Sequence, residues 1–270
     1  MLRLCALSAD ELLLACGDAG LRALSLDTGQ LAAREPTALR GDVRRVAFEA
    51  RTETLLLLVM AANGWQLVSL YRNASEWLEV QRLKTSLSSS VEMAVCNSRV
   101  LLGGGRMEKL YVFVVSAEHT LHDAGTVTLQ SRFYGLACTR RENDTLVAFG
   151  HGSSVSLQRL TSSPQRLEPL ASVNLTAPWR VLFLEELLLV ADWNTGTQEY
   201  SIVLFRALGD ALTEQRVLLE ALQSVYIFTW TLARDRLVLA DLNSGDLLVY
   251  DFRVKSELRR ESAIERPKAH

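Results

Sequence analysis

The sequence predicts an all-β fold made of repeated units, and three observations support it. An apolar run, a short turn containing Gly, Asp or Asn, and a second apolar run recur six times along the chain. Polar and charged stretches follow these runs, so apolar character falls off in the same way in each unit. The first small or acidic residues of the turns lie 44, 42, 47, 42 and 49 residues apart, at Gly17, Ala61, Gly103, Gly150, Asp192 and Asp241. A period in the forties, with about four strands per unit, is typical of β-propeller blades, so we predict six four-stranded blades.

Each unit is expected to hold four antiparallel strands that run outward from a central channel. The inner two are near-continuous apolar runs, as expected for strands packed between neighbouring blades. In the last unit the strands are predicted, from the channel outward, over residues 224–234, 236–241, 246–253 and 256–264, with an Asn-Ser-Gly turn within 241–245. Outer strands are polar and charged, for example at 30–40, 76–84 and 168–175.

Two alternatives remain open in this arrangement. Residues 209–223 combine helix-forming residues with apolar spacing near the helical period, so a helix could replace the outer strand that we place there. Propellers usually close by sharing one blade between both termini, and no blade is visibly divided here. Either six blades close the ring by packing alone, or the chain is an incomplete seven-bladed ring that a partner or a missing segment completes.

Composition and charge narrow the class of protein. The chain has 270 residues, 49% of them apolar, which excludes a disordered protein and allows a single propeller domain over 1–260 with a short tail at 261–270. Basic and acidic residues nearly balance, at 29 and 31, so we expect no nucleic-acid partner. No apolar run approaches the length of a membrane helix, and Asp10 and Glu11 interrupt the N-terminal run that could suggest a secretion signal.

The cysteines bear on the cellular compartment. Cys5, Cys16, Cys96 and Cys138 all lie in apolar, strand-like runs, so we expect buried, reduced thiols and a cytoplasmic protein, with a nuclear location also open. Three glycosylation triplets favour a secreted protein instead, against roughly one expected by chance from the composition. They are Asn73-Ala74-Ser75, Asn143-Asp144-Thr145 and Asn174-Leu175-Thr176.

Two turn sequences are similar to those of a known repeat family. Tyr250-Asp251 is followed by charged residues, and Asp27-Thr28-Gly29 supplies a short polar turn. Both resemble the end of the third strand in WD40 repeats, and the resemblance extends over residues 3–260. None of the six units opens with the Gly-His pair of such repeats, so the polar His–Asp network of that family cannot form here. The chain therefore resembles a divergent WD40-like propeller, which implies a disc that binds other proteins.

Two segments carry residue types used in chemistry. His119 and His122 sit just past residues 112–118, where we place an outer strand. Residues three apart on a strand point to opposite faces, so the two rings are not expected to share a metal ion. Residues 103–109 combine three glycines with two cations, but a strand follows them instead of the helix that a phosphate loop needs, which predicts a hairpin turn. We find no serine elbow and no cysteine beside a histidine.

Six-bladed lactonases offer an enzymatic alternative, because they hold a divalent cation in the channel with oxygen ligands from several blades. The oxygen donors near predicted turns are Asp18, Asn63, Asp192, Asn194, Asp241 and Asn243. These residues lie on turns between second and third strands, and such turn residues recur in every blade as ordinary hairpin chemistry, so we predict no metal site, no cofactor and no catalytic residue.

Partner binding is the remaining function. Trp193 and Asn194 fall in a predicted turn, and Trp179 and Arg180 begin a blade near the channel. Exposed Trp and Arg are common anchors of protein interfaces, although either tryptophan could pack on a neighbouring blade instead. We therefore expect a non-catalytic scaffold that binds proteins or peptides through Trp179, Arg180, Trp193 and Asn194, with no membrane partner. An extracellular ligand-binding propeller is a further alternative.

Overall fold

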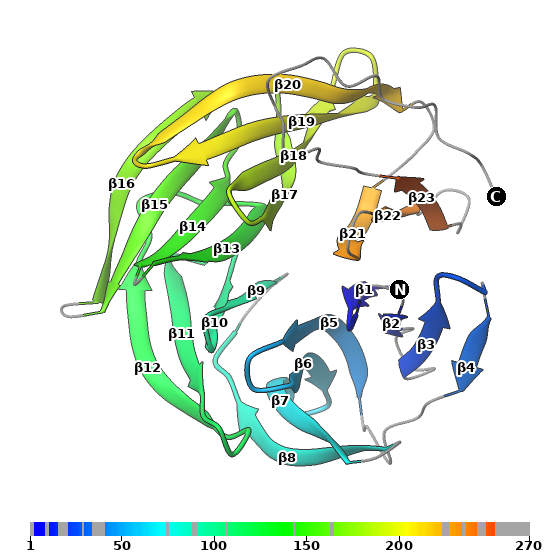
Figure 1. Ribbon diagram of the computed structural model, residues 1–270. Helices are drawn as coiled ribbons and strands as arrows, with labels where there is room; N and C mark the ends of the chain where they lie inside the picture. The colour runs from blue at the N-terminus through cyan, green and yellow to red at the C-terminus, as the bar shows by residue number, and fades with distance from the viewer. Residues whose placement is uncertain are drawn as a thin grey trace.

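The computed structural model shows six small antiparallel sheets arranged as blades around a central channel (Figure 1). It describes residues 3–8, 11–15, 21–28, 30–33, 41–73, 76–87, 91–105, 107–142, 144–162, 165–222, 227–233, 236–241 and 247–251. Blades 1 to 5 each contain four strands, and blade 6 contains three within these residues. The predicted all-β, six-bladed β-propeller is confirmed.

The strands follow one another outward from the channel within each blade, and consecutive strands pair antiparallel. Their bounds are β1 (Arg3–Ala6), β2 (Glu11–Ala15), β3 (Leu21–Ser25), β4 (Leu31–Ala33), β5 (Asp42–Glu49), β6 (Thr54–Ala61), β7 (Gly64–Asn73), β8 (Glu76–Lys84), β9 (Glu92–Cys96), β10 (Arg99–Gly103), β11 (Lys109–Val115), β12 (Leu121–Thr128), β13 (Gly135–Arg141), β14 (Asp144–Gly150), β15 (Ser154–Ser162), β16 (Gln165–Asn174), β17 (Pro178–Leu184), β18 (Leu187–Asn194), β19 (Glu199–Leu208), β20 (Ala211–Leu222), β21 (Ile227–Ala233), β22 (Arg236–Asp241) and β23 (Leu247–Asp251).

The repeat seen in the sequence corresponds to these blades. Ala61, Gly103, Gly150 and Asp241 each end the second strand of a blade, while Gly17 lies outside the described residues. The segment that also fits a helix is the outer strand β20, paired along β19. The outer strand predicted at 256–264 and the tail at 261–270 lie outside the described residues, so the domain bounds stay a prediction.

Packing between neighbouring blades explains why the second strands are so apolar. In β6, five consecutive residues from Leu55 to Val59 are fully buried. Because side chains alternate along a strand, Leu55 and Leu57 pack against blade 1, whereas Leu56 and Leu58 pack against blade 3. A strand buried on both faces needs apolar residues at every position, and each fully buried leucine contributes about 1.5–3 kcal/mol.

The ring closes where blade 6 meets blade 1 (Figure 1). Leu4, Leu12 and Leu14 of blade 1 form one buried cluster with Val238 and Ala240 of blade 6. The backbone N–H of Ala6 donates to Thr231 Oγ1 over 3.3 Å, and Arg236 lies 3.2 Å from Asp27. The inner strands of the two blades are direct neighbours, so this closure needs no seventh blade.

Two glycines allow blades 4 and 5 to approach closely at the channel. A Cβ atom on Gly150 would lie 2.7 Å from the carbonyl oxygen of Pro178, and one on Gly135 would lie 3.1–3.2 Å from the backbone of residues 179–181. Only glycine leaves room for backbones at such distances. This contact sets the path of the first residues of β17 beside β13.

We expect Gly150→Ala to lower the free energy of unfolding by about 1–3 kcal/mol, because the new methyl group must push two backbones apart. Gly152→Ala is the matched control, since a Cβ there meets no atom within 4 Å. Urea unfolding followed by circular dichroism measures both variants. Equal stability of the two would contradict the close approach.

Candidate interaction site at the channel mouth

Three charged side chains from three blades meet where the inner strands begin. Arg45 of β5 and Arg180 of β17 both donate to Glu92 Oε1 of β9, over 2.6 Å and 2.5 Å respectively. Their side chains are 12% and 11% exposed, and that of Glu92 is 17% exposed. Burial lowers the pKa of the Arg45 guanidinium, and the neighbouring Glu92 opposes this shift. Arginine keeps its charge in proteins, so one carboxylate here compensates two cations.

β-Bulges place the two arginines in this cluster. In β5, Val43 pairs with Val59 and Arg45 with Leu58, which leaves Arg44 as the extra residue. In β17, Pro178 pairs with Asp192 and Arg180 with Ala191, which leaves Trp179 as the extra residue. A bulge bends its strand and redirects the side chains beside it. Each arginine directly follows a bulge, and both reach the same carboxylate.

An aromatic pair lies next to this cluster. The rings of Tyr134 and Trp179 are stacked, with centroids 5.4 Å apart and planes 14° from parallel. The Arg180 guanidinium carbon lies 5.6 Å from the centre of the Trp179 ring. Tyr134 is 42% exposed and stacks on Trp179. Arg180, which is ion-paired with Glu92, lies beside the same tryptophan ring. Nε1 of Trp179 is buried, and no described residue accepts a hydrogen bond from it.

The four residues predicted to bind a partner fall into two groups. Trp179 and Arg180 begin β17, as predicted, and contact each other at the channel mouth. The turn predicted at Trp193 is wrong. Trp193 is half-buried inside β18 and pairs with Tyr200 of β19, and the centroids of the two rings are 4.5 Å apart. Asn194 is exposed, and its side chain accepts hydrogen bonds from the backbone N–H groups of Gly196 and Thr197.

The other chemical candidates have local structural roles. His119 precedes β12, accepts or donates one hydrogen bond at Thr54 Oγ1 and stacks on Tyr71 of blade 2. His122 lies in the outer strand β12 and contacts Thr120. Gly103 ends β10, Gly104 and Gly105 follow it, and β11 begins at Lys109 and pairs antiparallel with β10, as the predicted hairpin requires.

Two of the oxygen donors considered for a cation accept hydrogen bonds from nearby residues, and one of them, Asp192, lies inside strand β18 and not in the predicted turn. The Asn63 side-chain oxygen accepts from Gln66, and the Asp192 carboxylate accepts from the backbone of Thr176 and Ala177. Asp18 and Asn243 lie outside the described residues. Within the described ranges, no three His, Cys, Asp or Glu side chains gather closely enough to hold a metal ion. The same part of the chain contains no helix with the length and apolar character needed to span a membrane.

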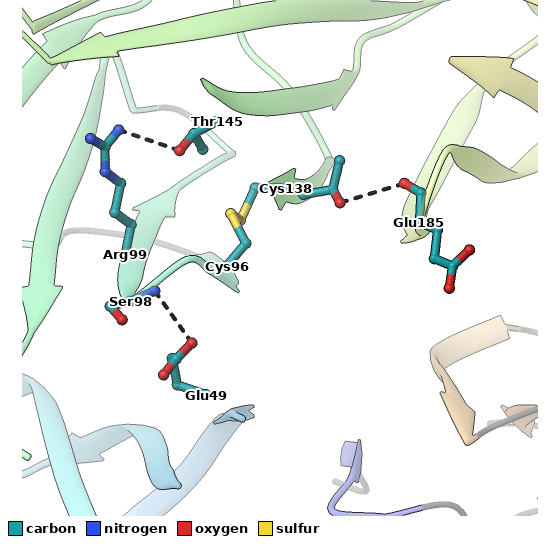
Figure 2. Close-up of a disulfide and its surroundings, with 8 residues drawn as sticks. Glu49, Cys96, Ser98, Arg99, Cys138, Thr145 and Glu185 are labelled. Atoms are coloured by element: carbon teal, nitrogen blue, oxygen red, sulfur yellow. Dashed lines mark hydrogen bonds between the residues drawn. A yellow bond between two sulfur atoms is a disulfide. The ribbon is translucent and has the colours of Figure 1, made fainter. Parts of the chain in front are cut away.

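A disulfide joins Cys96 of β9 to Cys138 of β13 (Figure 2), with the Cα atoms 5.9 Å apart. The expectation of reduced thiols is therefore wrong for these two residues. Their strands are the neighbouring inner strands of blades 3 and 4, which places the sulfur atoms within bonding reach. A disulfide that closes a loop of this size typically contributes about 2–4 kcal/mol. The cytoplasmic location was inferred from reduced thiols, and that support is lost.

Polar contacts between blades surround the disulfide (Figure 2). The Glu49 carboxylate accepts a hydrogen bond from the backbone N–H of Ser98, which links blades 2 and 3. Arg99 donates to Thr145 between blades 3 and 4, and Thr139 donates to the carbonyl oxygen of Glu185 between blades 4 and 5. The blades are thus joined by an ion-paired cluster where the inner strands begin, and by hydrogen bonds and a disulfide near the other ends of these strands.

Sequence reasoning missed Arg45, Glu92 and Tyr134. Arg45 and Glu92 are 47 residues apart, and Arg180 is 88 residues from Glu92. Tyr134 comes just before the innermost strand of blade 4, as the segment of Trp179 opens that of blade 5. Tyr134 and Trp179 therefore occupy similar positions in successive repeats, and this similarity could have indicated from the sequence that the two aromatic residues lie close together.

No family model matches the sequence, and no curated protein matches it. Solved structures do match. A protein from Lactobacillus plantarum has 13% identity and a TM-score of 0.59, covering 92% of this chain and 80% of its own. A chain from a mitotic checkpoint complex has 12% identity and a TM-score of 0.60, with coverage of 93% and 90%. A chain from a nidogen/laminin complex has 14% identity and a TM-score of 0.63, with coverage of 90% and 89%. They share the propeller fold.

We expect Glu92→Gln to lower the free energy of unfolding by about 3 kcal/mol, because it removes the carboxylate that two largely buried guanidinium groups share. The control is Arg166→Gln, which removes a surface pair with Glu168 from a side chain that is 63% exposed. Such a pair contributes at most about 1 kcal/mol. Chemical unfolding at fixed pH measures both, and equal losses would contradict a special role for the buried cluster.

We expect the Cys5 thiol to resist alkylation in the folded protein. It is buried, and burial raises its pKa to about 12, so the reactive thiolate is scarce at neutral and mildly alkaline pH. Peptide mass spectrometry after iodoacetamide treatment measures this, with urea-unfolded protein as the control. Rapid alkylation of Cys5 in the native state would contradict the structure of blade 1.

Proposed function

We propose that the protein is a non-catalytic, WD40-like β-propeller scaffold that binds another protein or a peptide at the channel mouth. The binding surface consists of Tyr134, Trp179 and Arg180, with Asn194 at the tip of the next hairpin. The observation that carries the proposal is the exposed Tyr134 ring stacked on Trp179, beside an arginine that is ion-paired with Glu92.

The chemistry of this surface supports protein binding. Tyr, Trp and Arg are the residue types that most often dominate interface energies. The stack and the ion pair fix these side chains before a partner arrives, which reduces the entropy lost on binding. These features occur together at the start of β17 and the end of the segment before β13.

The similar solved structures add limited support. Two of them come from protein assemblies, a mitotic checkpoint complex and a nidogen/laminin complex. Their identity to this chain is low, so they support the suitability of the fold for protein binding rather than a particular partner. The nearly balanced charge of the chain supports a protein partner over a nucleic acid.

We expect Tyr134→Ala to weaken partner binding at least tenfold while leaving stability within about 0.5 kcal/mol, because the side chain is exposed. Affinity purification from a native extract, with quantitative mass spectrometry, identifies the partner. Titration of the purified pair then measures the dissociation constant.

The matched control is Val217→Ala. Val217 is 40% exposed on the outer strand β20, away from the channel. A partner lost with Tyr134→Ala and retained with Val217→Ala supports the channel-mouth surface. A partner retained by both variants places binding elsewhere and overturns this proposal.

A further inference from the structure

We propose that this chain carries N-linked glycans on Asn174 and Asn73, and that it matures in an oxidising compartment. Two unrelated features lead to this inference. One is the Cys96–Cys138 disulfide, and the other is the exposure of asparagines that belong to glycosylation triplets. The proposal is independent of which partner the channel mouth binds.

The disulfide restricts the compartment. Disulfides form and persist in the secretory pathway and outside the cell, and they are rare in the cytosol, where reducing systems keep thiols free. Formation of the bond releases two protons, and an external disulfide oxidant accepts the two electrons. Such an oxidant is supplied in the compartment where N-linked glycans are added.

Asn174 is well placed for modification. It ends the outer strand β16 and is exposed, as is Thr176. Leu175 lies between them and packs against the cluster shared by blades 4 and 5. Leu175 is partly buried, whereas the two residues that the modifying enzyme must recognise, Asn174 and Thr176, are both exposed. The triplet is thus accessible as a unit.

Asn73 occupies a similar position on blade 2. It is exposed at the end of β7, and β8 begins at Glu76, which is also exposed. The other two residues of this triplet, Ala74 and Ser75, lie outside the described residues, so only the asparagine itself supports this site. In the third triplet the asparagine itself, Asn143, lies outside the described residues, and this triplet carries no part of the argument.

The modification is a transfer reaction with a defined balance. The side-chain amide nitrogen of Asn174 attacks the anomeric carbon of a lipid-pyrophosphate-linked oligosaccharide. A carbon–nitrogen bond forms, the bond from that carbon to the pyrophosphate oxygen breaks, and the nitrogen gives up one proton. The lipid pyrophosphate is the leaving group, and the transferring enzyme belongs to the host cell.

The first test uses the protein isolated from its own cells in the presence of N-ethylmaleimide, digested without reduction. We expect the Cys96 and Cys138 peptides to be recovered as one linked species. Treatment with peptide N-glycosidase in isotopically labelled water should convert Asn174 and Asn73 to labelled aspartate. Both cysteines recovered as alkylated thiols would overturn the compartment, and an unmodified asparagine before enzyme treatment would overturn that site.

A second test separates recognition from folding. The full chain is expressed in a mammalian secretory host as Thr176→Ala and Thr176→Ser, with Ser75→Ala and Ser75→Thr as the corresponding pair at Asn73. We expect each alanine variant to lose one glycosidase-sensitive mobility step, and each hydroxyl-bearing variant to keep it, with the same circular dichroism throughout. Loss in the hydroxyl-bearing variants, or no step in the parent chain, would overturn the proposal.

Discussion

Apolar packing between the faces of neighbouring sheets is the interaction on which the ring depends. Each sheet is covered on both sides by other sheets, so its second strand is a continuous apolar run and does not alternate with polar residues. The fully buried run from Leu55 to Val59 shows this most directly, since successive side chains enter two different clusters. This requirement explains why a leucine-rich sequence with few glycines forms strands throughout.

The same requirement made most of the fold predictable. A strand buried on both faces gives a continuous apolar run, and the tight turn that follows gives Gly, Asp or Asn, so β6 with β7 and β18 with β19 can be located from local sequence alone. The boundaries were less predictable. Trp193 lies among turn-forming residues, yet its pairing with Tyr200 extends the hairpin past them. Tertiary hydrogen bonding overrode the local preference there.

The candidate site was only partly predictable, because its contacts join blades that are distant in sequence. Arg180 and Trp179 were recognisable as interface residue types, but nothing local connects Arg180 to Glu92 across 88 residues. The disulfide was accessible in principle. Cys96 and Cys138 are 42 residues apart, within the range of one repeat, and so occupy the same inner strand of successive blades. In a ring, equal position in the repeat means proximity in space.

Within the described residues, no backbone segment connects blade 6 to blade 1, so packing and hydrogen bonds alone join these two blades. The Cys96–Cys138 bond lies at the opposite interface of the ring, between blades 3 and 4 (Figure 1). Arg45, Glu92, Arg180 and Tyr134 all belong to blades 2 to 5 or the segments that lead into them. The channel-mouth surface is therefore built on the part of the ring that has both backbone connections and a covalent cross-link.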